Sequence, residues 1–397
     1  MAIFLTGATG YLGSYLTDRL LRAGETLTVL VRAGDADHAR QRLWKALQLH
    51  LPANTLAGHL GEGRLRFLRG DLTAPRLGLT PAEHARLVDE HSTVVHAAAT
   101  LNRRSSRACF DVNLRGGLNV IQLARAIHEA GRLRRYAHVS TVAIAGKRQG
   151  ELVGEDEALG WERSDWDPYA RTKKFGEHLI DELLPDASVV IGRPSIVLGD
   201  ARFPQTTQFD MARAFAVLAR LPALPFRPEW RLDIVNVDFV ADALADLIRK
   251  EAPRHRVYHL SAGAAAPTFA EITDALAREG VTRRPPRYLP RLGGPVARAV
   301  HSLSNARRLG PVAGAAALLD VFWPYLEWDV VFDHRRVVEE TARAPQPFPR
   351  RGGALLRWCE AQGFRYPYRG LPPVLADVDA GDWQLAEPAA AGRGCRA

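Results

Sequence analysis

Short apolar runs and amphipathic stretches follow one another along most of the chain. The apolar runs are rich in Val, Leu and Ile, whereas apolar residues in the stretches between them recur every three or four positions. Such a succession predicts buried parallel strands that alternate with helices. The predicted strands are residues 2–6, 26–31, 65–68, 93–96, 135–139, 188–191, 234–237 and 257–260. This order predicts an α/β fold built on a doubly wound parallel sheet.

The regular succession weakens in the second half of the chain, where apolar, aromatic and proline-rich segments interrupt it. We therefore predict a Rossmann domain over residues 1–200, with its sheet completed by residues 231–262. A smaller, mainly helical region that binds substrate or forms a lid is predicted over residues 201–230 and 263–385. The end of the chain, residues 386–397, is rich in Ala and Gly, which predicts a disordered tail.

Three glycines at three-residue spacing lie where the first predicted strand meets the first predicted helix. An amphipathic stretch runs from Tyr11 to Ala23, so that it includes the third glycine, and ends before Gly24. Glycine lets the backbone turn sharply and approach phosphate oxygens, while the amides and the dipole at the start of a helix attract an anion. The segment therefore predicts a dinucleotide pyrophosphate site. Its predicted contacts are Thr6, Gly7, Thr9, Gly10, Tyr11, Leu12 and Gly13.

The residue that closes the second strand indicates which dinucleotide is bound. Arg32 directly follows the run 26–31, and a cation at this position would hold the 2′-phosphate of NADP. Asp35 and Asp37 follow closely, and a carboxylate there would instead bond the free ribose hydroxyls of NAD. We predict NADP (NADPH) and keep NAD as the less favoured cofactor.

Further cofactor contacts are predicted where the other strands end, because open parallel sheets build their sites at the carboxyl edge. Asp71 is placed to contact the adenine edge, and the alanines after the fourth strand leave room for a cofactor. Asn113, on a helix predicted over residues 106–130, is placed to bond a backbone carbonyl or water near the site. The additional contacts are Asp71, Leu72, Ala97, Ala98, Ala99, Asn113, Ser140, Pro194, Ser195 and Val197.

One tyrosine and one lysine share a face of the helix predicted over residues 168–184, because Tyr169 and Lys173 are four positions apart. A nearby ammonium stabilises a phenolate and lowers the tyrosine pKa from about 10 toward the working range. Thr141, at a strand end, can bond a substrate oxygen. We predict Thr141, Tyr169 and Lys173 as catalytic residues, the last two also contacting the cofactor. Such a pair also occurs on ordinary helix surfaces, so the prediction depends on the glycine turn.

Composition and charge narrow the class of protein. The chain has 397 residues, of which 47% are hydrophobic and 24% charged, as is typical of a soluble globular protein. No leader pattern and no run of about 18 apolar residues is present, so we predict a cytoplasmic protein. Cys109, Cys359 and Cys395 are scattered and offer no metal-ligand spacing, so no metal is predicted.

The net charge of +9 suggests an anionic partner, although a generally arginine-rich composition explains it equally well. Nucleic acid is not predicted, because the basic residues are spread out and no recognition motif accompanies them. Residues 282–326 join a basic, leucine-containing stretch to a strongly apolar one. This segment predicts a lid over the substrate, a surface that meets an acidic carrier, or a peripheral membrane contact.

Together these residues resemble the extended short-chain dehydrogenase/reductases. The resemblance lies in the turn from Thr6 to Gly13, in Val139-Ser140-Thr141, in Tyr169 with Lys173, and in residues 193–197. Within that superfamily the chain is most similar to the thioester reductase and fatty acyl-CoA reductase group, which has the male-sterility-type NAD-binding domain. The stretches that resemble this group are residues 30–33, Arg42-Leu43, residues 70–79 and residues 330–333.

The resemblance implies that Thr141, Tyr169 and Lys173 are the catalytic triad and that Arg32 contacts the 2′-phosphate. It implies NADPH-dependent reduction of an acyl thioester, held on CoA or on an acidic acyl-carrier protein, to an aldehyde that a second hydride could carry to the alcohol. Ala97 stands where the group often has Asn, and Thr172 replaces a common Ser; neither change removes a chemical function. Because no adenylation or carrier segment precedes Met1, we expect a free-standing reductase acting in trans.

Two other functions fit the same residues. A sugar-nucleotide epimerase or dehydratase, or a hydroxysteroid-type dehydrogenase, would share the Thr, Tyr and Lys but handle the cofactor differently, since an epimerase usually keeps NAD bound through turnover. A cofactor-binding regulator without catalysis would share only the glycine turn, and the intact Thr141, Tyr169 and Lys173 argue against it.

Overall fold

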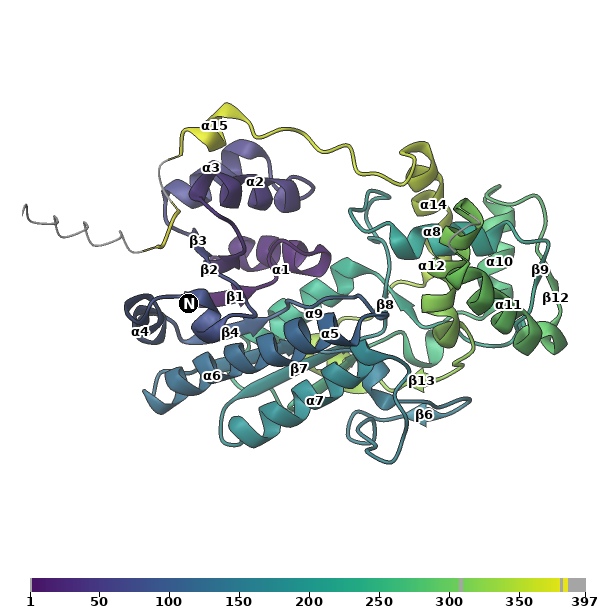
Figure 1. The fold of residues 1–397 in the computed structure, drawn as a ribbon, viewed down its shortest axis with the longest axis horizontal. Coiled ribbons are helices and arrows are strands. Elements are labelled where there is room, and N and C mark those ends of the chain that lie inside the picture. Colours follow the sequence, from purple (N-terminus) through teal and green to yellow (C-terminus); the bar gives the residue numbers. More distant parts are fainter. Residues whose placement is uncertain (1, 307–309, 379–380, 385–397) are drawn as a thin grey trace, which may run out of the picture.

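The computed structural model describes residues 2–306, 310–378 and 381–384. Its centre is a seven-stranded sheet with the order β11-β7-β5-β4-β1-β2-β3, and every neighbouring pair is parallel (Figure 1). The strands are β1 (Ala2–Thr6), β2 (Thr26–Val31), β3 (Leu65–Arg69), β4 (Thr93–His96), β5 (Arg135–Val139), β7 (Val189–Pro194) and β11 (Val257–Leu260). The predicted α/β fold with a doubly wound Rossmann sheet is confirmed. The tail predicted over residues 386–397 lies outside the described residues.

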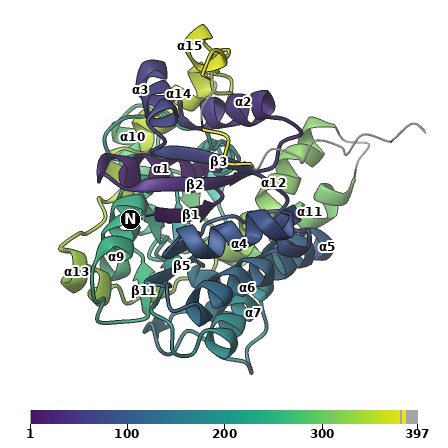
Figure 2. The same ribbon diagram turned by 90° about the vertical axis from the view of Figure 1, so that its left-hand side faces the viewer.

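Helices cover both faces of this sheet (Figure 2). One face carries α1 (Tyr11–Arg22), α2 (Ala36–Leu47), α3 (Ala53–Gly61) and α9 (Val237–Arg249), and the other carries α4 (Pro81–Glu90), α6 (Gly116–Glu129) and α7 (Pro168–Leu183). Successive β1 side chains enter different cores: Ile3 and Leu5 belong to the first, and Phe4 belongs to the second. Because both faces are buried, the central strands β1 and β2 are almost unbroken apolar runs, whereas the edge strand β3 also contains Arg66 and Arg69.

The helix predicted over residues 106–130 is interrupted. It consists of α5 (Ser106–Cys109), a π-helical turn at Phe110–Arg115, and α6. Asn113 is buried in this turn. A π-turn inserts an extra residue into a helix and often occurs at functional sites. The spacing of apolar residues does not indicate it.

The strand predicted over residues 234–237 does not join the main sheet, so that part of the prediction is wrong. Instead β10 (Ile234–Val235) pairs with β8 (Ile196–Val197) in a separate two-stranded parallel sheet. The chain leaves the main sheet after β7, and β11 rather than β10 pairs with β7. The apolar run at β10 is also short, because α9 begins at Val237.

A lobe of helices stands beside the sheet, at the right of Figure 1. It contains α8 (Asp210–Ala219), α10 (Phe269–Arg278), α11 (Gly293–Asn305), α12 (Pro311–Leu326) and α14 (Gly352–Ala361), with the strand pair β9 (Ala223–Leu224) and β12 (Arg287–Tyr288). We call it the helical lobe, and we call the sheet with its helices the Rossmann half. The lobe has its own core, in which Phe226 contacts the rings of Phe269 and Trp323 at centroid distances of 4.9 and 5.1 Å.

The last described part of the chain returns to the Rossmann half. The Trp44 indole donates a hydrogen bond to the carbonyl of Gly370 (2.8 Å), and the amide of Phe67 donates one to the carbonyl of Gly381 (2.7 Å). Trp383 is buried among residues of the second core. Residues 366–384 belong to the region predicted to bind substrate, but these contacts place them mostly on the other half of the molecule.

The remaining elements are short. They are β6 (Leu152–Val153) with its partner β13 (Val331–Phe332), α13 (Arg335–Thr341), α15 (Pro373–Ala376), and 3₁₀ turns at Pro75–Gly78, Val142–Ala145, Gly263–Ala265, Pro290–Leu292 and Phe348–Arg350. Within the part of the chain that the structure describes, no helix combines the length and apolarity needed to cross a bilayer.

Candidate active site

The turn between β1 and α1 is built for close backbone approach. Gly7 has a φ of +86°, and a Cβ there would lie 2.5 Å from the nitrogen of Ala98. A Cβ on Gly13 would lie 1.9 Å from the carbonyl oxygen of Gly7. Both positions therefore require glycine, and the turn leaves a shallow cradle at the start of α1. Thr6, below the turn, bonds the ring of His96 (2.7 Å between Oγ1 and Nδ1) and so joins β1 to β4.

Two arginines meet at the end of β2. Arg42 of α2 donates a hydrogen bond from Nη1 to the backbone carbonyl of Arg32 (2.5 Å). The pKa of Arg42 is lowered, first by burial and then by the positive charge of Arg32. Both nearby carboxylates face other partners: Asp35 caps α2 by accepting from the amide of His38 (2.7 Å), and Asp37 pairs with Arg40 (2.6 Å).

Asp71 and Leu72 follow β3. The carboxylate of Asp71 accepts hydrogen bonds from the amide and the hydroxyl of Thr73, both at 2.8 Å, and the backbone bond is the main reason that its pKa is lowered. The carbonyl of Leu72 accepts from the amide of Asn119 (2.9 Å). These bonds fix the loop at the edge of the sheet where the adenine contact was predicted.

The loop after β4 is held by Asn113. Its side-chain oxygen accepts from the amide of Thr100 (2.8 Å), and its amide donates to the carbonyl of Thr100 and to the Thr172 hydroxyl, both at 3.2 Å. The predicted bond from Asn113 to a backbone carbonyl is therefore confirmed. Because Thr172 is next to Lys173, Asn113 also fixes the loop relative to the helix that carries the predicted catalytic pair.

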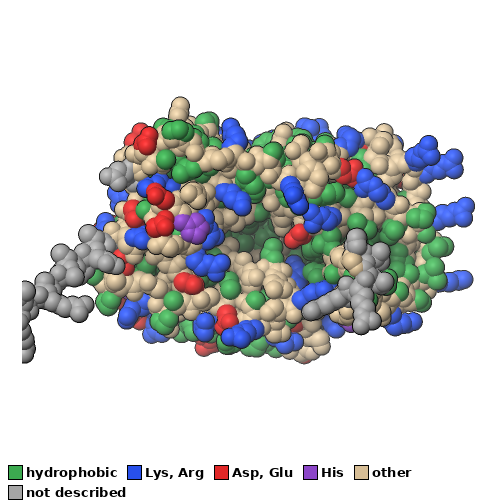
Figure 3. Space-filling model, turned by 45° about the horizontal axis from the view of Figure 1, so that its top comes forward, with side chains coloured by type: hydrophobic (Ala, Val, Ile, Leu, Met, Phe, Trp, Pro, Cys, Tyr) green, Lys and Arg blue, Asp and Glu red, His purple; other side chains and the backbone are tan. Residues whose placement is uncertain are grey.

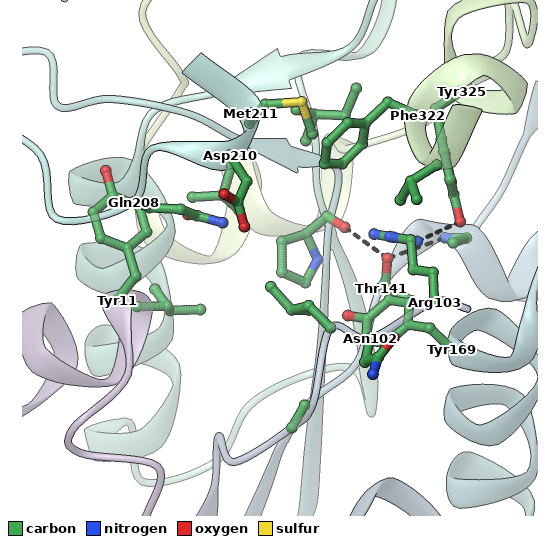
Figure 4. Close-up of a pocket in the computed structure, with 18 of the residues that line it drawn as sticks. Tyr11, Asn102, Arg103, Thr141, Tyr169, Gln208, Asp210, Met211, Phe322 and Tyr325 are labelled. Atoms are coloured by element: carbon green, nitrogen blue, oxygen red, sulfur yellow. Dashed lines mark hydrogen bonds between the residues drawn. The ribbon is translucent and has the colours of Figure 1, made fainter. Parts of the chain in front are cut away.

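A cavity of about 870 Å³ opens at the carboxyl edge of the sheet (Figure 4). It brings together most of the predicted site residues, namely Gly10, Tyr11, Leu12, Gly13, Ala97, Ala99, Ser140, Thr141, Tyr169, Lys173, Pro194, Ser195 and Val197. The other predicted contacts do not line it: Thr6, Gly7, Arg32, Asp71, Leu72, Ala98 and Asn113 lie behind or beside it, and Thr9 lines a neighbouring hollow.

Thr141 and Tyr169 face each other at the base of this cavity (Figure 4). The Thr141 hydroxyl donates to the carbonyl of Pro194 (3.5 Å) and also shares a hydrogen bond with Tyr169. Burial raises the pKa of Tyr169, while the positive charge of Arg103 and the bond with Thr141 act in the opposite direction. The net direction is upward, so the prediction that Lys173 lowers the pKa of Tyr169 toward neutrality is wrong, because burial outweighs the nearby positive charge. Tyr169 is therefore a protonated hydroxyl at neutral pH.

Lys173 is fully enclosed behind the tyrosine. Its ammonium donates to the carbonyl of Val139 (2.7 Å), and burial lowers its pKa to about 8, an effect that Glu177 partly offsets. Glu177 in turn accepts from the Ser140 hydroxyl and forms a buried ion pair with Arg193 (2.6 Å). Lys173 and Ser140 are thus held in place by one buried polar network around the end of β5.

Sequence reasoning missed three residues of this site as a group: Arg103, Asp167 and Tyr325. Arg103 donates from Nη1 to Asp167 (3.0 Å) and to the hydroxyl of Tyr325 (2.5 Å), and that hydroxyl donates to Asp167 (2.7 Å). We call them the interlobe cluster, because Tyr325 belongs to α12 and the others to the Rossmann half. The sequence marked Asp167 only as a helix cap, and nothing in the pattern around Arg103 distinguishes it from the other arginines.

The helical lobe supplies the outer wall of the cavity. Its lining side chains are largely apolar: Met211 and Val217 come from α8, and Leu318, Val321 and Phe322 come from α12. Of the three roles predicted for residues 282–326, the structure therefore supports a wall over the pocket for the α12 part. Figure 3 shows a hollow with apolar side chains in its depth and Lys and Arg side chains around it.

A second hollow of about 780 Å³ adjoins the first. The two share Gly10, Tyr11, Leu101, Gln208, Asp210 and Arg213. Arg42 and Lys45 of α2 line one side of the second hollow, and Arg213 of α8 lines the other. The ammonium of Lys45 lies 4.8 Å from the ring centre of Tyr368, on the chain segment that follows α14. The mouth of the site is therefore basic, although Asp210 also lines it.

Known proteins similar to this chain are reductases and peptide synthetases. The nonribosomal peptide synthetase asaC of Aspergillus flavus is 30% identical over 271 residues, which cover 65% of this chain and 26% of that protein. A carboxylic acid reductase of Mycobacterium tuberculosis is 29% identical over 289 residues, with 65% and 24% covered. The chain thus spans about a quarter of the length of these relatives.

Among solved structures, the terminal R domain of the myxalamid PKS-NRPS biosynthetic pathway matches with a TM-score of 0.75 and 25% identity, covering 91% of each chain. The family model described as "Male sterility protein" matches residues 5–244, which include the glycine turn, Thr141, Tyr169 and Lys173. The chain has an NAD(P)-binding domain and belongs to this male sterility protein family, so the resemblance predicted from its sequence is confirmed.

Proposed function

We propose that the chain is an NADPH-dependent reductase that converts an acyl thioester into an aldehyde. One observation carries the proposal: Thr141, Tyr169 and Lys173 converge on a single cavity beside the glycine turn, and an apolar wall faces them. The membership of the chain in its family, and the names of its relatives, support the same reaction class.

The residues present fit a dinucleotide cofactor. A Cβ at Gly7 or Gly13 would collide with neighbouring backbone, so these glycines keep the turn tight, and Gly10 at the start of α1 lines both hollows, where a pyrophosphate would lie. Bound NADPH would supply a hydride to the thioester carbonyl carbon. Thr141 and Tyr169 would hydrogen-bond the developing oxyanion, and Tyr169 would give it the proton. Lys173 would hold the nicotinamide ribose and favour the phenolate left behind. The resulting hemithioacetal then breaks its carbon–sulfur bond, which releases the thiol and the aldehyde.

The raised pKa of Tyr169 suits this role, since a proton donor must carry its proton at the working pH. Loss of that proton occurs as the pH rises through the tyrosine pKa, so the rate should fall only in alkaline solution. A second hydride transfer at the same residues would carry the aldehyde to the alcohol.

NADPH is favoured over NADH by charge. Arg32 and Arg42 lie together at the end of β2, and the pKa of Arg42 is lowered partly by the charge of Arg32. A 2′-phosphate would relieve this repulsion and accept charge-assisted hydrogen bonds. The carboxylates that would favour NAD, Asp35 and Asp37, are already engaged by a helix cap and an ion pair.

The carrier of the acyl group is proposed to be CoA or an acyl-carrier protein. Lys45 and Arg213 stand at the mouth of the site, and both kinds of carrier present phosphate and other negative charges there. The apolar side chains of α8 and α12 would receive the acyl group.

The test is an NADPH-consumption assay with a panel of acyl-CoA, acyl-carrier, aldehyde and nucleotide-sugar substrates. We expect turnover of a thioester and a fall in kcat of about 1,000-fold in Tyr169→Phe, with NADPH binding retained. Turnover of nucleotide sugars alone, or stoichiometric NAD in the purified protein, would favour the epimerase class. An unchanged rate in Tyr169→Phe would remove the tyrosine from the mechanism.

A further inference from the structure

The guanidinium of Arg103 lies between the rings of two tyrosines. Its central carbon is 4.5 Å from the ring centre of Tyr169 and 4.7 Å from that of Tyr325 (Figure 4). A cation this close to an aromatic face is attracted by the ring, most strongly where water is excluded. The Arg103 side chain is only 16% exposed. Arg103 therefore restrains the ring of Tyr169 on the side that Thr141 does not hold.

Asp167 connects this contact to the helix that carries Tyr169. One carboxylate oxygen caps α7 by accepting from the amide of Ala170 (2.8 Å), and the other accepts from Arg103 and from Tyr325. The Asp167 side chain is 14% exposed. A buried ion pair adds little net stability compared with apolar residues of similar volume, because desolvating the charges costs about as much as their attraction returns. The main effect of the Arg103–Asp167 ion pair is therefore to fix the orientation of the Arg103 side chain.

Tyr325 connects the helical lobe to Arg103 and Asp167. It projects from α12, the helix whose Leu318 and Phe322 line the outer wall of the cavity. Burial raises the pKa of Tyr325 well above its ordinary value, so its hydroxyl remains protonated and can accept from Arg103 while donating to Asp167. The position of α12 is thus linked to the position of the Tyr169 ring through two side chains.

We propose that Arg103 is a positioning residue for Tyr169 and that it is held in its working position by Tyr325 of the helical lobe. The inference rests on the proposed proton-donor role of Tyr169 and deepens it. Arg103 keeps the phenol ring against Thr141 and favours the negative charge that develops on it. A helical lobe displaced from the sheet would release Arg103, so that proton transfer is efficient only while α12 closes the cavity.

The experiment measures kcat, KM and NADPH affinity for Arg103→Gln, Arg103→Lys and Tyr325→Phe. We expect kcat to fall by tenfold or more in Arg103→Gln, because small misplacements of a catalytic group are costly, with NADPH affinity little changed. The melting temperature should fall as well, because the half-buried Asp167 carboxylate loses its cation, so kcat is measured well below it. Arg103→Lys, which keeps the charge, should recover part of the loss. Tyr325→Phe, which keeps the ring but loses the hydroxyl, should lower kcat less than Arg103→Gln does.

Arg104→Gln is the matched control. Arg104 is the next residue and also contacts α12, through Asp320 (2.9 Å), but no contact joins it to Tyr169 in the described structure. Because Arg104 also lines the cavity, we expect Arg104→Gln to raise the KM for the thioester, with a fall in kcat much smaller than that of Arg103→Gln. An equal fall in Arg104→Gln and Arg103→Gln would overturn the proposal, because any interlobe contact would then have the same effect.

A double-mutant cycle separates positioning from direct contact with substrate. If Arg103 acts through Tyr169, adding Arg103→Gln to Tyr169→Phe should lower the residual rate little further. Independent, multiplying losses would contradict the proposal. If the natural chain reduces no thioester, the proposed function fails instead, and the same cycle on whichever substrate of the panel is turned over still tests the role of Arg103.

Discussion

The Rossmann half and the helical lobe share one cavity but are specified in different ways. In the Rossmann half the central strands β1 and β2 are apolar runs buried on both faces. No other residue can replace the glycines at the first turn, because a Cβ at Gly13 would overlap the carbonyl of Gly7. In the helical lobe, α12 is apolar over much of its length and includes Pro324, so its sequence does not indicate which face meets the sheet. The site residues of the Rossmann half are placed by local backbone geometry, whereas the helical lobe is placed by contacts between segments far apart in the chain.

Glycine-to-alanine substitutions give the largest expected contrast between the two regions. Gly13→Ala should destabilise the chain by about 3 kcal/mol and abolish NADPH binding, since the backbone must shift to admit the methyl group. Gly314→Ala in α12 has no atom within 4 Å of the new Cβ and should be neutral or stabilise by up to about 1 kcal/mol. Urea denaturation and NADPH titration measure both. Equal losses of stability and of NADPH binding in Gly13→Ala and Gly314→Ala would contradict the proposed difference between the two regions.

Arg32→Gln should weaken the preference for NADPH over NADH and leave the KM for the thioester unchanged, because Arg32 belongs to the Rossmann half alone. Loss of a charge-assisted phosphate contact should raise the KM for NADPH about tenfold or more, with little change for NADH. Asp37→Asn is a suitable control, because Asp37 is largely exposed and its carboxylate pairs with Arg40. A parallel rise in the KM for NADPH and for NADH would refute the phosphate assignment.

The smallest effect is expected at the mouth of the site, where each region contributes one cation. Lys45→Met in α2 and Arg213→Gln in α8 should each raise the KM for an acyl-CoA by about threefold, since exposed charge contacts are weak. The same acyl group on N-acetylcysteamine, which has no phosphate, should show no change. Arg284→Gln, an exposed charge elsewhere on the helical lobe, controls for net charge. A rise in the KM for NADPH instead would assign this hollow to the cofactor.

Much of the Rossmann half could be predicted from the sequence, because its signals are local. The strand, turn and helix around Gly7, the cap and proline that begin α7, and the spacing of Tyr169 and Lys173 all depend on residues close together in the chain. The pairing of β10 was mispredicted because a two-residue apolar run carries no information about its partner. The interlobe cluster was missed for a related reason: Arg103 and Tyr325 are 222 positions apart, and neither has a local pattern that points to the other.

The three visits of the chain to the helical lobe have an architectural consequence. The chain enters the lobe around α8, goes back to the sheet for α9 and β11, and enters again for α10 to α12. It returns for β13 and α13, enters a third time for α14, and finally lies along α2 and β3 through the Gly370 and Gly381 contacts. The lobe is therefore not an appended module that can be exchanged by a single cut. A graft of this pocket onto another dinucleotide-binding scaffold would need all three excursions and the closing segment, spliced at six or more junctions.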